Sequence, residues 1–534
     1  MIIHELKIIQ EEHGYLPAEE LQALARRLNV PLYRLHGVAS FYPHFRLQPP
    51  PAVDVQVCSD IACFLRGATD VHAIVQTAAD SLELKDIRIR PTSCLGQCDR
   101  APAIAINDQY YTEVNAQRIT GFLQTVAGGR TLRRQRMIPA ARTFACNPYA
   151  GTPTYEALQR LRQQSDATAV LTELKQSGLR GMGGAGFPTG TKWELVRNTP
   201  GEAKYVVCNA DESEPGTFKD RVILHDLPEL VIEGMAIAAL VVGARQVIVY
   251  LRHEYARERE TLHQALRQCQ GRGLLGDLTF EIFDSPGGYI CGEETALLEA
   301  LEDKRAEPRN KPPFPGTHGL FGKPTLLNNV ETFAMVPGIL LKGGAWWAAQ
   351  GKNGASGLKF LAVSGHVRNP GVYEVPLGTT ATELIALAGG LRHSRPLKAF
   401  APGGASSGFL PASMADTPLD FRALAAVGSM LGSGAVVAIA EGTCMLELAL
   451  NVGRFFRNES CGKCVPCRVG SEKIVMLLEG ILHGRGSAAD LALIEELSAT
   501  MALTSICGLG QAAPNPILSV IKYFKDDITR YITR

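Results

Sequence analysis

The sequence has almost no excess charge: it contains 54 lysines and arginines and 53 aspartates and glutamates, which gives a formal net charge of +1. A nearly neutral chain without a long basic run gives no basis for a nucleic-acid partner. The chain also lacks an uncharged hydrophobic run, since its most apolar stretch, 230–251, contains Glu233 and Arg245. That stretch predicts a buried helix followed by a strand, so we expect no direct membrane insertion.

The first residues, MIIHELKIIQEEHGYL, lack the charged-then-apolar pattern of an export signal and carry acidic side chains early. We therefore expect a cytoplasmic protein. The sequence has no internal repeat and no low-complexity tract. Its 534 residues, 46% hydrophobic and 20% charged, are typical of a globular protein but too many for one core, so we expect three to five domains.

Cysteine is plentiful, with 13 residues. In a chain without an export signal this number indicates metal or redox chemistry rather than disulfides. The segment ESCGKCVPC contains Cys461, Cys464 and Cys467, and three thiolates on one tight loop can each bind a different iron of a cubane. With Cys507 as the expected fourth ligand, the pattern predicts a [4Fe–4S] cluster; a zinc site, which usually takes its sulfurs as two pairs, is the alternative.

A second set of four cysteines consists of two pairs, Cys58 with Cys63 and Cys94 with Cys98. Each pair follows a β-like segment, so we expect both to lie on loops after strands in a small α/β domain. Two pairs of thiolates suit either zinc or a [2Fe–2S] cluster. We favour [2Fe–2S], because a second predicted cluster is present in the same chain. The five other cysteines are expected to be packed as small hydrophobic residues: Cys146, Cys208, Cys269, Cys291 and Cys444.

A glycine-rich segment, LRGMGGAGFPTGTKW at 179–193, satisfies the G-x-G-x-x-G pattern of dinucleotide-binding turns. Such a turn should follow a strand and be followed by an acidic residue about twenty positions later. Here the preceding segment has a helical pattern, and the first predicted strand comes after the loop. We therefore interpret the loop as a phosphate and flavin cradle of another design, in which backbone N–H groups and Lys192 face the anion.

Polar and acidic residues gather at three places after this loop. The strand AKYVVCNADESEPGT ends in an acidic segment, where carboxylates suit the hydroxyl-rich ribityl and ribose chains. A second loop, SPGGYICGEETALLEAL at 285–301, surrounds a tyrosine with glycines and opens a helix with two glutamates; an ordinary capped helix is the alternative. The third segment, 311–332, is rich in proline and by itself predicts only an ordered loop.

Four segments in this order resemble a known family: SGLRGMGGAGFPTGTKW, NADESEPGTFKDR, GGYICGEETALLEALE and ESCGKCVPCRVG. They are similar to the NADH-binding, FMN-containing flavoprotein (diaphorase) subunit of respiratory complex I, over residues 150 to the end. Residues 1–130 resemble the thioredoxin-like [2Fe–2S] partner subunit, here fused in front. The fusion and the segments at 400–421 and 505–527 look most like the beta subunit of cytoplasmic, NAD-dependent molybdenum or tungsten formate dehydrogenases.

The resemblance implies a multidomain α/β fold with these parts: an N-terminal helical region (1–48), a thioredoxin-like [2Fe–2S] domain (49–130), a Rossmann-like FMN- and NAD(H)-binding domain (145–345), a β-grasp domain of the soluble ligand-binding type (355–442) and a C-terminal helical bundle with the [4Fe–4S] cluster (445–534). The β-grasp part is expected to hold subunits together and shows no chemistry of its own. The basic stretch at 130–142 is expected to be a solvated linker, with docking of a partner as the alternative.

The resemblance also implies two overlapping sites. The residues around FMN are Gly181, Gly183, Gly184, Lys192, Asn209, Asp211, Glu212, Ser213, Tyr289, Gly292, Glu293, Asn328, Asn329 and Thr332. The residues around the nicotinamide dinucleotide are Phe187, Lys192, Glu214, Glu294 and Phe314. The complex I type usually has arginine where this chain has Met182, so Met182 is left out of the site.

The implied activity is that of a diaphorase, which exchanges electrons between NAD(H) and a partner. Because FMN can handle both hydride and single electrons, no residue is expected to act as a general acid or base. Glu212 is expected to lower the potential of the flavin, and an acid such as Glu214 near the adenosine ribose favours NAD over NADP.

The implied partner is a catalytic formate dehydrogenase subunit with molybdenum or tungsten and further iron–sulfur clusters, with a small [2Fe–2S] subunit as an optional further partner. The alternatives are an NAD-reducing hydrogenase, a fused complex I subunit, an adaptor with a vestigial flavin site, and a structural zinc protein.

Overall fold

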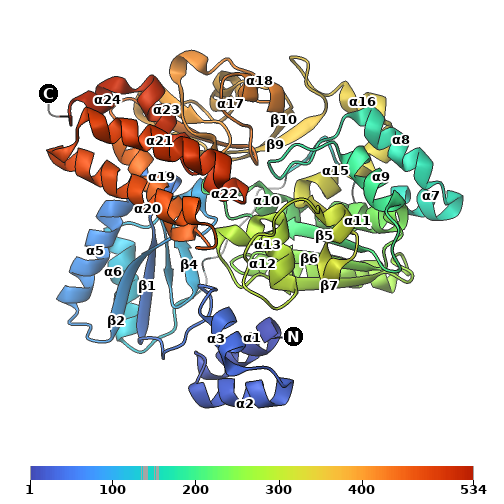
Figure 1. Cartoon of the computed structure of the whole chain (residues 1–534), viewed down its shortest axis with the longest axis horizontal. Helices are drawn as coiled ribbons and strands as arrows, with labels where there is room; N and C mark the ends of the chain where they lie inside the picture. Colours follow the sequence, from blue (N-terminus) through green and yellow to red (C-terminus); the bar gives the residue numbers. More distant parts are fainter. Residues whose placement is uncertain (1, 134, 136–141, 150, 152–154, 533–534) are drawn as a thin grey trace.

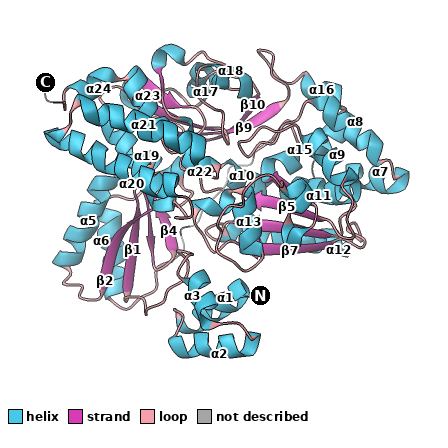
Figure 2. Ribbon diagram, viewed as in Figure 1, coloured by secondary structure: helices cyan, strands magenta, loops and turns pink. Residues whose placement is uncertain are grey.

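The computed structural model describes residues 2–133, 135, 142–149, 151 and 155–532, so most of the basic stretch at 130–142 lies outside the described residues. Figures 1 and 2 show five parts, of which the largest, toward the right of the view, contains the parallel strands β5, β6 and β7. The N-terminal part consists of three helices, α1 (Ile2–His13), α2 (Ala18–Leu28) and α3 (Leu32–Ala39). Their apolar side chains share a core with those of helix α13 (Glu294–Leu301), and Tyr42 donates its hydroxyl to Lys304 O at 2.5 Å.

The second part is a small α/β domain with strand order β2-β1-β3-β4. Its strands are β1 (Val53–Cys58), β2 (Ile87–Thr92), β3 (Ala103–Ile106) and β4 (Gln109–Thr112), and its main helices are α5 (Ala68–Ser81) and α6 (Ala116–Ala127). Strand β1 is parallel to β2 and antiparallel to β3. Cys58 is the last residue of β1 and Cys63 lies in the short helix α4 (Ile61–Phe64), whereas Cys94 lies in the loop after β2 and Cys98 begins η1 (Cys98–Arg100). Both pairs thus lie at or just after the end of a strand, but only Cys94 is in a loop, so the prediction of loops after strands is confirmed in part.

The central domain contains a four-stranded, fully parallel sheet in the order β7-β6-β5-β8. Its strands are β5 (Tyr205–Ala210), β6 (Gln246–Leu251), β7 (Thr279–Asp284) and β8 (Thr325–Asn329). Its helices are α7 (Glu156–Gln164), α8 (Ala167–Ser177), α9 (Thr189–Asn198), α10 (Lys219–Asp226), α11 (Pro228–Val242), α12 (Ala256–Gly271), α13 (Glu294–Leu301), α14 (Pro315–His318), α15 (Val330–Lys342) and α16 (Gly344–Ala348), with η2 (Tyr289–Gly292) and η3 (Leu320–Gly322).

The apolar stretch at 230–251 forms the buried helix α11 and strand β6, as predicted. Helix α11 packs closely on α15, since a Cβ on Gly234 would lie 2.0 Å from Phe333 O. Any side chain there would collide with backbone, so Gly234 is required by the packing of these two helices. In the part of the chain that the structure describes, no helix is both long and apolar enough to cross a membrane.

The fourth part is a mixed five-stranded sheet in the order β10-β9-β13-β11-β12. It contains β9 (Leu358–Gly365), β10 (Gly371–Pro376), β11 (Leu397–Ala401), β12 (Leu410–Pro411) and β13 (Ala435–Ala440), with α17 (Ala381–Leu387), α18 (Phe421–Ala426), η4 (Arg392–Ser394), η5 (Ala405–Ser407) and η6 (Ala412–Met414). The fifth part is the C-terminal bundle of α19 (Met445–Glu459), α20 (Val465–Gly480), η7 (Ile481–Arg485), α21 (Ala488–Thr504), α22 (Gly508–Ala512), α23 (Asn515–Tyr523) and α24 (Lys525–Thr529).

Candidate functional site

The candidate site lies at the carboxyl edge of the central parallel sheet. From β5 the chain continues to β6 and β7 on one side and then crosses to β8 on the other side of β5. Open α/β sheets bind their ligands at such a switch point. The register pairs Asn209 of β5 with Asn329 of β8, so these two predicted site residues lie at this point.

The glycine-rich loop connects α8 to α9 and lies against β8 and α15. It follows a helix and precedes the first strand of the sheet, which confirms that it is not a Rossmann turn. The Met182 N–H donates to Thr332 Oγ1 at 2.9 Å, and the Met182 side chain is buried. A Cβ on Gly183 would lie 3.0 Å from the Cβ of Asn329. A glycine at this position therefore lets the loop backbone approach the end of β8.

The fourth part, which contains strands β9 to β13 and which we call the β-grasp domain, also contacts the glycine-rich loop. Gly184 has φ 128°, and a Cβ on it would lie 3.6 Å from the carbonyl carbon of Gly432. The hydroxyls of Thr217 and Ser433 are 2.7 Å apart. The β-grasp domain thus packs against the glycine loop. Its sequence did not indicate this contact.

The acidic segment after β5 is held by short polar contacts. Asn209 donates its amide to Gly292 O at 2.8 Å, which joins the end of β5 to the loop at 285–301. Ser213 and Ser285 donate their hydroxyls to Asp211 at 3.2 and 3.3 Å. Burial raises the pKa of Asp211 to about 7. Asp211 is therefore an acceptor at the sheet edge whose charge is costly to bury without a ligand.

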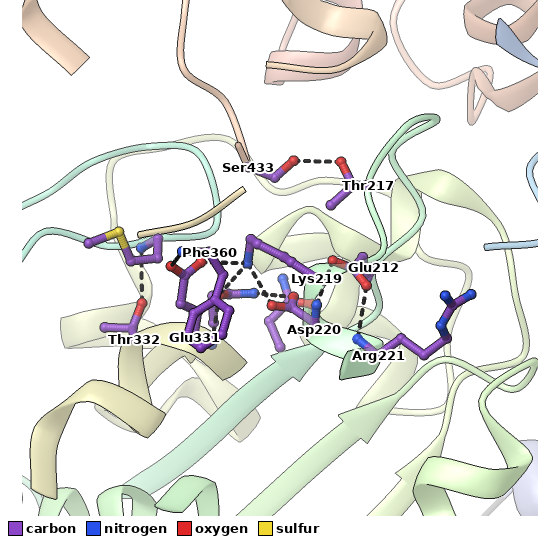
Figure 3. A network of polar contacts seen from close by, with 12 residues as sticks. Glu212, Thr217, Lys219, Asp220, Arg221, Glu331, Thr332, Phe360 and Ser433 are labelled. Atoms are coloured by element: carbon purple, nitrogen blue, oxygen red, sulfur yellow. Dashed lines mark hydrogen bonds and ion pairs between the residues drawn. The ribbon is translucent and has the colours of Figure 1, made fainter. Parts of the chain in front are cut away.

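The Glu212 carboxylate is bound by donors of the protein itself, and its expected effect on the flavin potential stays a prediction. The carboxylate accepts the backbone N–H groups of Asp220 and Arg221 at 2.9 and 3.1 Å (Figure 3). It also accepts the Tyr255 hydroxyl at 2.9 Å. Burial raises its pKa to about 7. The Glu212 side chain thus fixes the acidic segment to the start of α10.

Glu214 and Tyr289 form a pair that connects three domains. Tyr289 donates its hydroxyl to Glu214 at 2.5 Å, and Glu214 also accepts the Ser406 N–H of the β-grasp domain at 2.7 Å. The Tyr289 ring lies edge-on to Phe455 of α19, with ring centroids 5.0 Å apart. Burial raises the pKa of Glu214. The Glu214 carboxylate therefore accepts hydrogen bonds from two groups of the protein itself, Tyr289 and Ser406.

Two lysines and two glutamates face each other beside the glycine loop. Lys192 donates to Leu327 O at 2.7 Å and lies 3.8 Å from Glu294. Lys311 contacts Glu293 at 3.0 Å and Glu294 at 3.1 Å. Glu293 also accepts the backbone N–H groups of the first turn of α13, which confirms the capping interpretation for this residue. All four side chains remain between 14% and 28% exposed, so a polar ligand can reach them.

Phe187 and Phe314 are accessible aromatic side chains near this cluster, with 49% and 58% of their surface exposed. Phe187 lies just before α9, and Phe314 lies just before α14, which packs against α9. An exposed ring can stack on a nicotinamide or adenine ring without first giving up a partner. Their exposure fits the predicted dinucleotide contact.

The Lys192→Met variant is expected to weaken binding of the cofactors at this site. One charged donor is worth about 1.5–3 kcal/mol, which corresponds to a loss of affinity of about 10- to 150-fold. The measurement is titration of the purified chain with FMN and with NADH, followed by flavin fluorescence. Lys175→Met is the matched control, because Lys175 pairs with Glu194 at 2.6 Å on the exposed surface. Unchanged affinity for both ligands in Lys192→Met would remove Lys192 from the site.

A buried network of charges lies behind the two asparagines at the end of β8 (Figure 3). Lys219 contacts Asp220 at 2.6 Å and Glu331 at 2.9 Å, and Lys359 of β9 contacts Glu331 at 2.5 Å. Asn329 donates its amide to Asp220 at 2.6 Å. Lys219, Glu331 and Lys359 are completely buried. The network therefore joins a predicted site residue to the β-grasp domain through water-excluded ion pairs.

The four cysteines of the α/β domain lie together. The Sγ atoms of Cys94 and Cys98 are 3.3 Å apart, and the Cys58 thiol contacts those of Cys63 and Cys94. All four are buried. Two loops that each bring two thiols to one buried point suit a [2Fe–2S] cluster, in which each iron takes two thiolates.

The four cysteines of the bundle also meet. Cys464 is the N-cap of α20 and Cys507 is the N-cap of α22. Cys467 lies beside Cys464, and Cys507 interacts electrostatically with Cys461. A Cβ on Gly510 would lie 2.8 Å from the Cβ of Cys467, so this glycine lets α22 approach α20. The donor set fits a [4Fe–4S] cluster.

Within the described residues, no three or more His, Cys, Asp or Glu side chains are arranged around a single-ion centre. The fit of the clusters therefore rests on the all-thiol donor sets and on the contacts given above. All 13 cysteines are free thiols. Of the five outside the two sets, four are buried and Cys444 is half-buried, as expected for packed side chains.

Several residues of the site were not found from sequence. Lys219, Arg221 and Glu459 lie inside the segments that carry the family resemblance, but no spacing showed which groups they contact. Lys311 and Arg252 lie outside those segments. Glu459 accepts Ser93 Oγ at 2.5 Å and the Tyr289 N–H at 2.7 Å, two residues before Cys461.

A candidate nucleotide site at a sheet switch point, together with two groups of four cysteines, is typical of an iron–sulfur flavoprotein. Residues 174–338 match the Nuo51 FMN-binding domain, and residues 1–127 match the thioredoxin-like [2Fe-2S] ferredoxin. Residues 360–409 match the SLBB domain, and residues 447–531 match the NADH-ubiquinone oxidoreductase-F iron-sulfur binding region. These matches confirm the predicted fold class, FMN and both clusters, and NAD(H) as substrate is consistent with them.

Similar proteins support the same assignment. An F-type NADH-quinone oxidoreductase protein of Rhizobium meliloti is 43% identical over 71% of this chain and 92% of its own length. The NADP-reducing hydrogenase protein HndC of Solidesulfovibrio fructosivorans is 40% identical over 72% of this chain and 80% of its own length. A chain of the NAD+-reducing [NiFe]-hydrogenase in the H2-reduced state matches 99% of this chain and 93% of its own, with TM-score 0.90 and 32% identity. The chain therefore belongs to the F-type, FMN-binding flavoprotein family of NADH-quinone oxidoreductases, whose members oxidise NADH as diaphorase subunits.

Proposed function

We propose that this chain is the cytoplasmic diaphorase subunit of an NAD-dependent formate dehydrogenase, and that it passes electrons reversibly between NAD(H) and a formate-oxidising partner. Bound FMN supplies the exchange between hydride and single-electron transfer. The protein's own residues bind and orient: the glycine loop and Lys192 hold the phosphate, and Asn209, Asp211, Asn328 and Asn329 hold the polar chain. Phe187, Glu294 and Phe314 hold the nicotinamide dinucleotide.

The observation that carries the diaphorase activity is the meeting of the flavin site with both cysteine sets. Glu459 accepts one hydrogen bond from Ser93, next to Cys94, and one from Tyr289 of the flavin domain. The same residue lies two positions before Cys461. Electron carriers must be close to exchange single electrons, and this contact supports one connected site.

Exposed apolar side chains around the [4Fe–4S] loop support a docked partner with further iron–sulfur clusters. Val465, Val469 and Met476 of α20 and Leu503 of α21 are 54% to 84% exposed. Large exposed apolar side chains that cluster in one place are typical of protein interfaces. Since Val465 follows Cys464 directly, a partner on this face would lie beside the cluster.

The choice of partner rests on the sequence resemblance, including the fused [2Fe–2S] domain and Met182 in the glycine loop. A hydrogenase partner is the second candidate, because a chain of an NAD+-reducing [NiFe]-hydrogenase matches nearly the whole length of this chain, the fused domain included. Glu214 supports NAD as the dinucleotide, whereas the relative HndC belongs to an NADP-reducing hydrogenase.

The test is anaerobic purification of the native complex through this chain, followed by NAD+ reduction with formate and, in parallel, with hydrogen. Reduction by formate alone is the expected result. Reduction by hydrogen alone would replace the formate dehydrogenase assignment by the hydrogenase. If neither donor reduces NAD+ while NADH still bleaches the flavin, the formate dehydrogenase and hydrogenase assignments are both wrong. A partner of the complex I type would then be tested.

A further inference from the structure

Two buried arginines of the flavin domain bind the ligand loop of the [2Fe–2S] domain. Arg252 follows β6 and is only 2% exposed. Its guanidinium donates to Cys94 O and to Glu212 O, and it pairs with Glu254 at 2.9 Å. One side chain therefore connects a predicted cluster ligand to the acidic segment of the flavin site.

Arg221 binds the same loop from the first turn of α10. It is 4% exposed, donates to Gly96 O and to Gln97 Oε1, the latter at 3.1 Å, and pairs with Asp99 at 2.7 Å. Its backbone N–H donates to Glu212 at 3.1 Å. Both arginines thus join the loop 94–99 to the surroundings of Glu212.

The loop conformation depends on these contacts. Gly96 has φ 67°, and a Cβ on it would lie 3.0 Å from the Tyr255 ring, so the loop backbone packs directly on the flavin domain. The Gly96 N–H donates to Cys94 Sγ at 3.4 Å. Because the arginines hold the carbonyls on both sides of this N–H, they also orient it toward the sulfur.

Hydrogen bonds to the sulfurs and nearby charge set the potential of an iron–sulfur cluster. Reduction adds one negative charge, so a buried positive charge favours the reduced cluster. An arginine keeps its charge at any accessible pH. In a buried setting this charge is poorly screened and acts strongly on the cluster.

We propose that Arg221 and Arg252 are positioning residues that raise the reduction potential of the [2Fe–2S] cluster and hold it against the flavin site. This inference rests on the proposed assignment of Cys58, Cys63, Cys94 and Cys98 as its ligands. Arg221→Gln removes a charge and keeps an amide donor. Arg252→Lys keeps the charge and loses the double donation to Cys94 O and Glu212 O.

The test is a redox titration of the native complex, followed by the electron paramagnetic resonance signals of both clusters. For Arg221→Gln we expect the [2Fe–2S] equilibrium to shift at least tenfold toward the oxidised form, which is a potential lower by about 59 mV. For Arg252→Lys we expect changed g values of the [2Fe–2S] signal with a smaller shift. The [4Fe–4S] signal should not move in either variant. The matched control is Arg259→Gln. Arg259 of α12 pairs with Asp284 of β7 at 2.6 Å and not with the loop 94–99.

Loss of the [2Fe–2S] signal alone, with two iron atoms fewer per chain and the [4Fe–4S] signal retained, would also support the positioning role. Unchanged potential and g values in both arginine variants would overturn it. A wild-type complex without any [2Fe–2S] signal would instead refute the ligand assignment and, with it, the inference. The dehydrogenase test with formate and hydrogen does not depend on these variants, so the two proposals can fail separately.

Discussion

Replacing Cys464 by serine is expected to remove the [4Fe–4S] cluster and to abolish electron transfer from NADH to the partner. Serine offers a hard oxygen that ionises poorly, whereas the cluster irons require soft thiolates. Iron analysis should show a loss of about four atoms per chain. NADH should still reduce the bound flavin, because the glycine loop and the acidic segment belong to another domain.

The control for this experiment is Cys444→Ser in the same bundle. Cys444 is the N-cap of α19, is half-buried and lies outside both cysteine sets. This variant should keep its iron and its activity with the partner. If Cys464→Ser retains the full iron content, the assignment of Cys464 as a cluster ligand is wrong.

The Glu331→Gln variant is expected to lose about 3–5 kcal/mol of stability, since it removes the shared partner of two buried lysines. Glu331 contacts Lys219 at 2.9 Å and Lys359 at 2.5 Å, and none of the three side chains is exposed. The measurement is the denaturant midpoint followed by tryptophan fluorescence, because Trp193 and Trp347 are completely buried in this domain. Midpoints are compared because a chain of several domains need not unfold in one step.

The stability that the Glu331→Gln variant loses relative to the wild type, its stability deficit, should depend on pH. Burial lowers the pKa of Lys359 to about 8, and Glu331 acts against this lowering. Without Glu331 the pKa falls further, so Lys359 releases its proton below pH 8 and its burial then costs less. We therefore expect the deficit to shrink as the pH rises from 6 to 8.

The matched control is Lys352→Gln, which breaks an exposed ion pair with Glu383. Exposed pairs are worth about 0–1 kcal/mol, so its midpoint should stay close to that of the wild type. A Glu331→Gln midpoint as close to wild type as this control would show that the buried network does not stabilise the domain.

The sequence predicted what depends on neighbouring residues along the chain. Three cysteines separated by two residues each predict a thiolate loop from their spacing alone, and a pair of cysteines near the end of each of two strands predicts where the second cluster lies. The apolar stretch at 230–251 likewise determines a buried helix and strand. The family resemblance added the fold of each part and the cofactors, which the comparisons confirm. The individual FMN and dinucleotide contacts, the domain boundaries and the formate partner stay predictions.

Only the tertiary structure decided which charges are buried together. In the sequence, Arg252, Lys359 and Glu459 look like ordinary surface charges, because their partners in other domains lie far away along the chain. Arg252 binds Cys94 O, 158 residues away, and Glu459 binds Ser93 Oγ, 366 residues away. Local spacing predicts the ligands of each cluster. The connections between the domains come from packing, which brings distant polar groups out of water and requires each to find a partner.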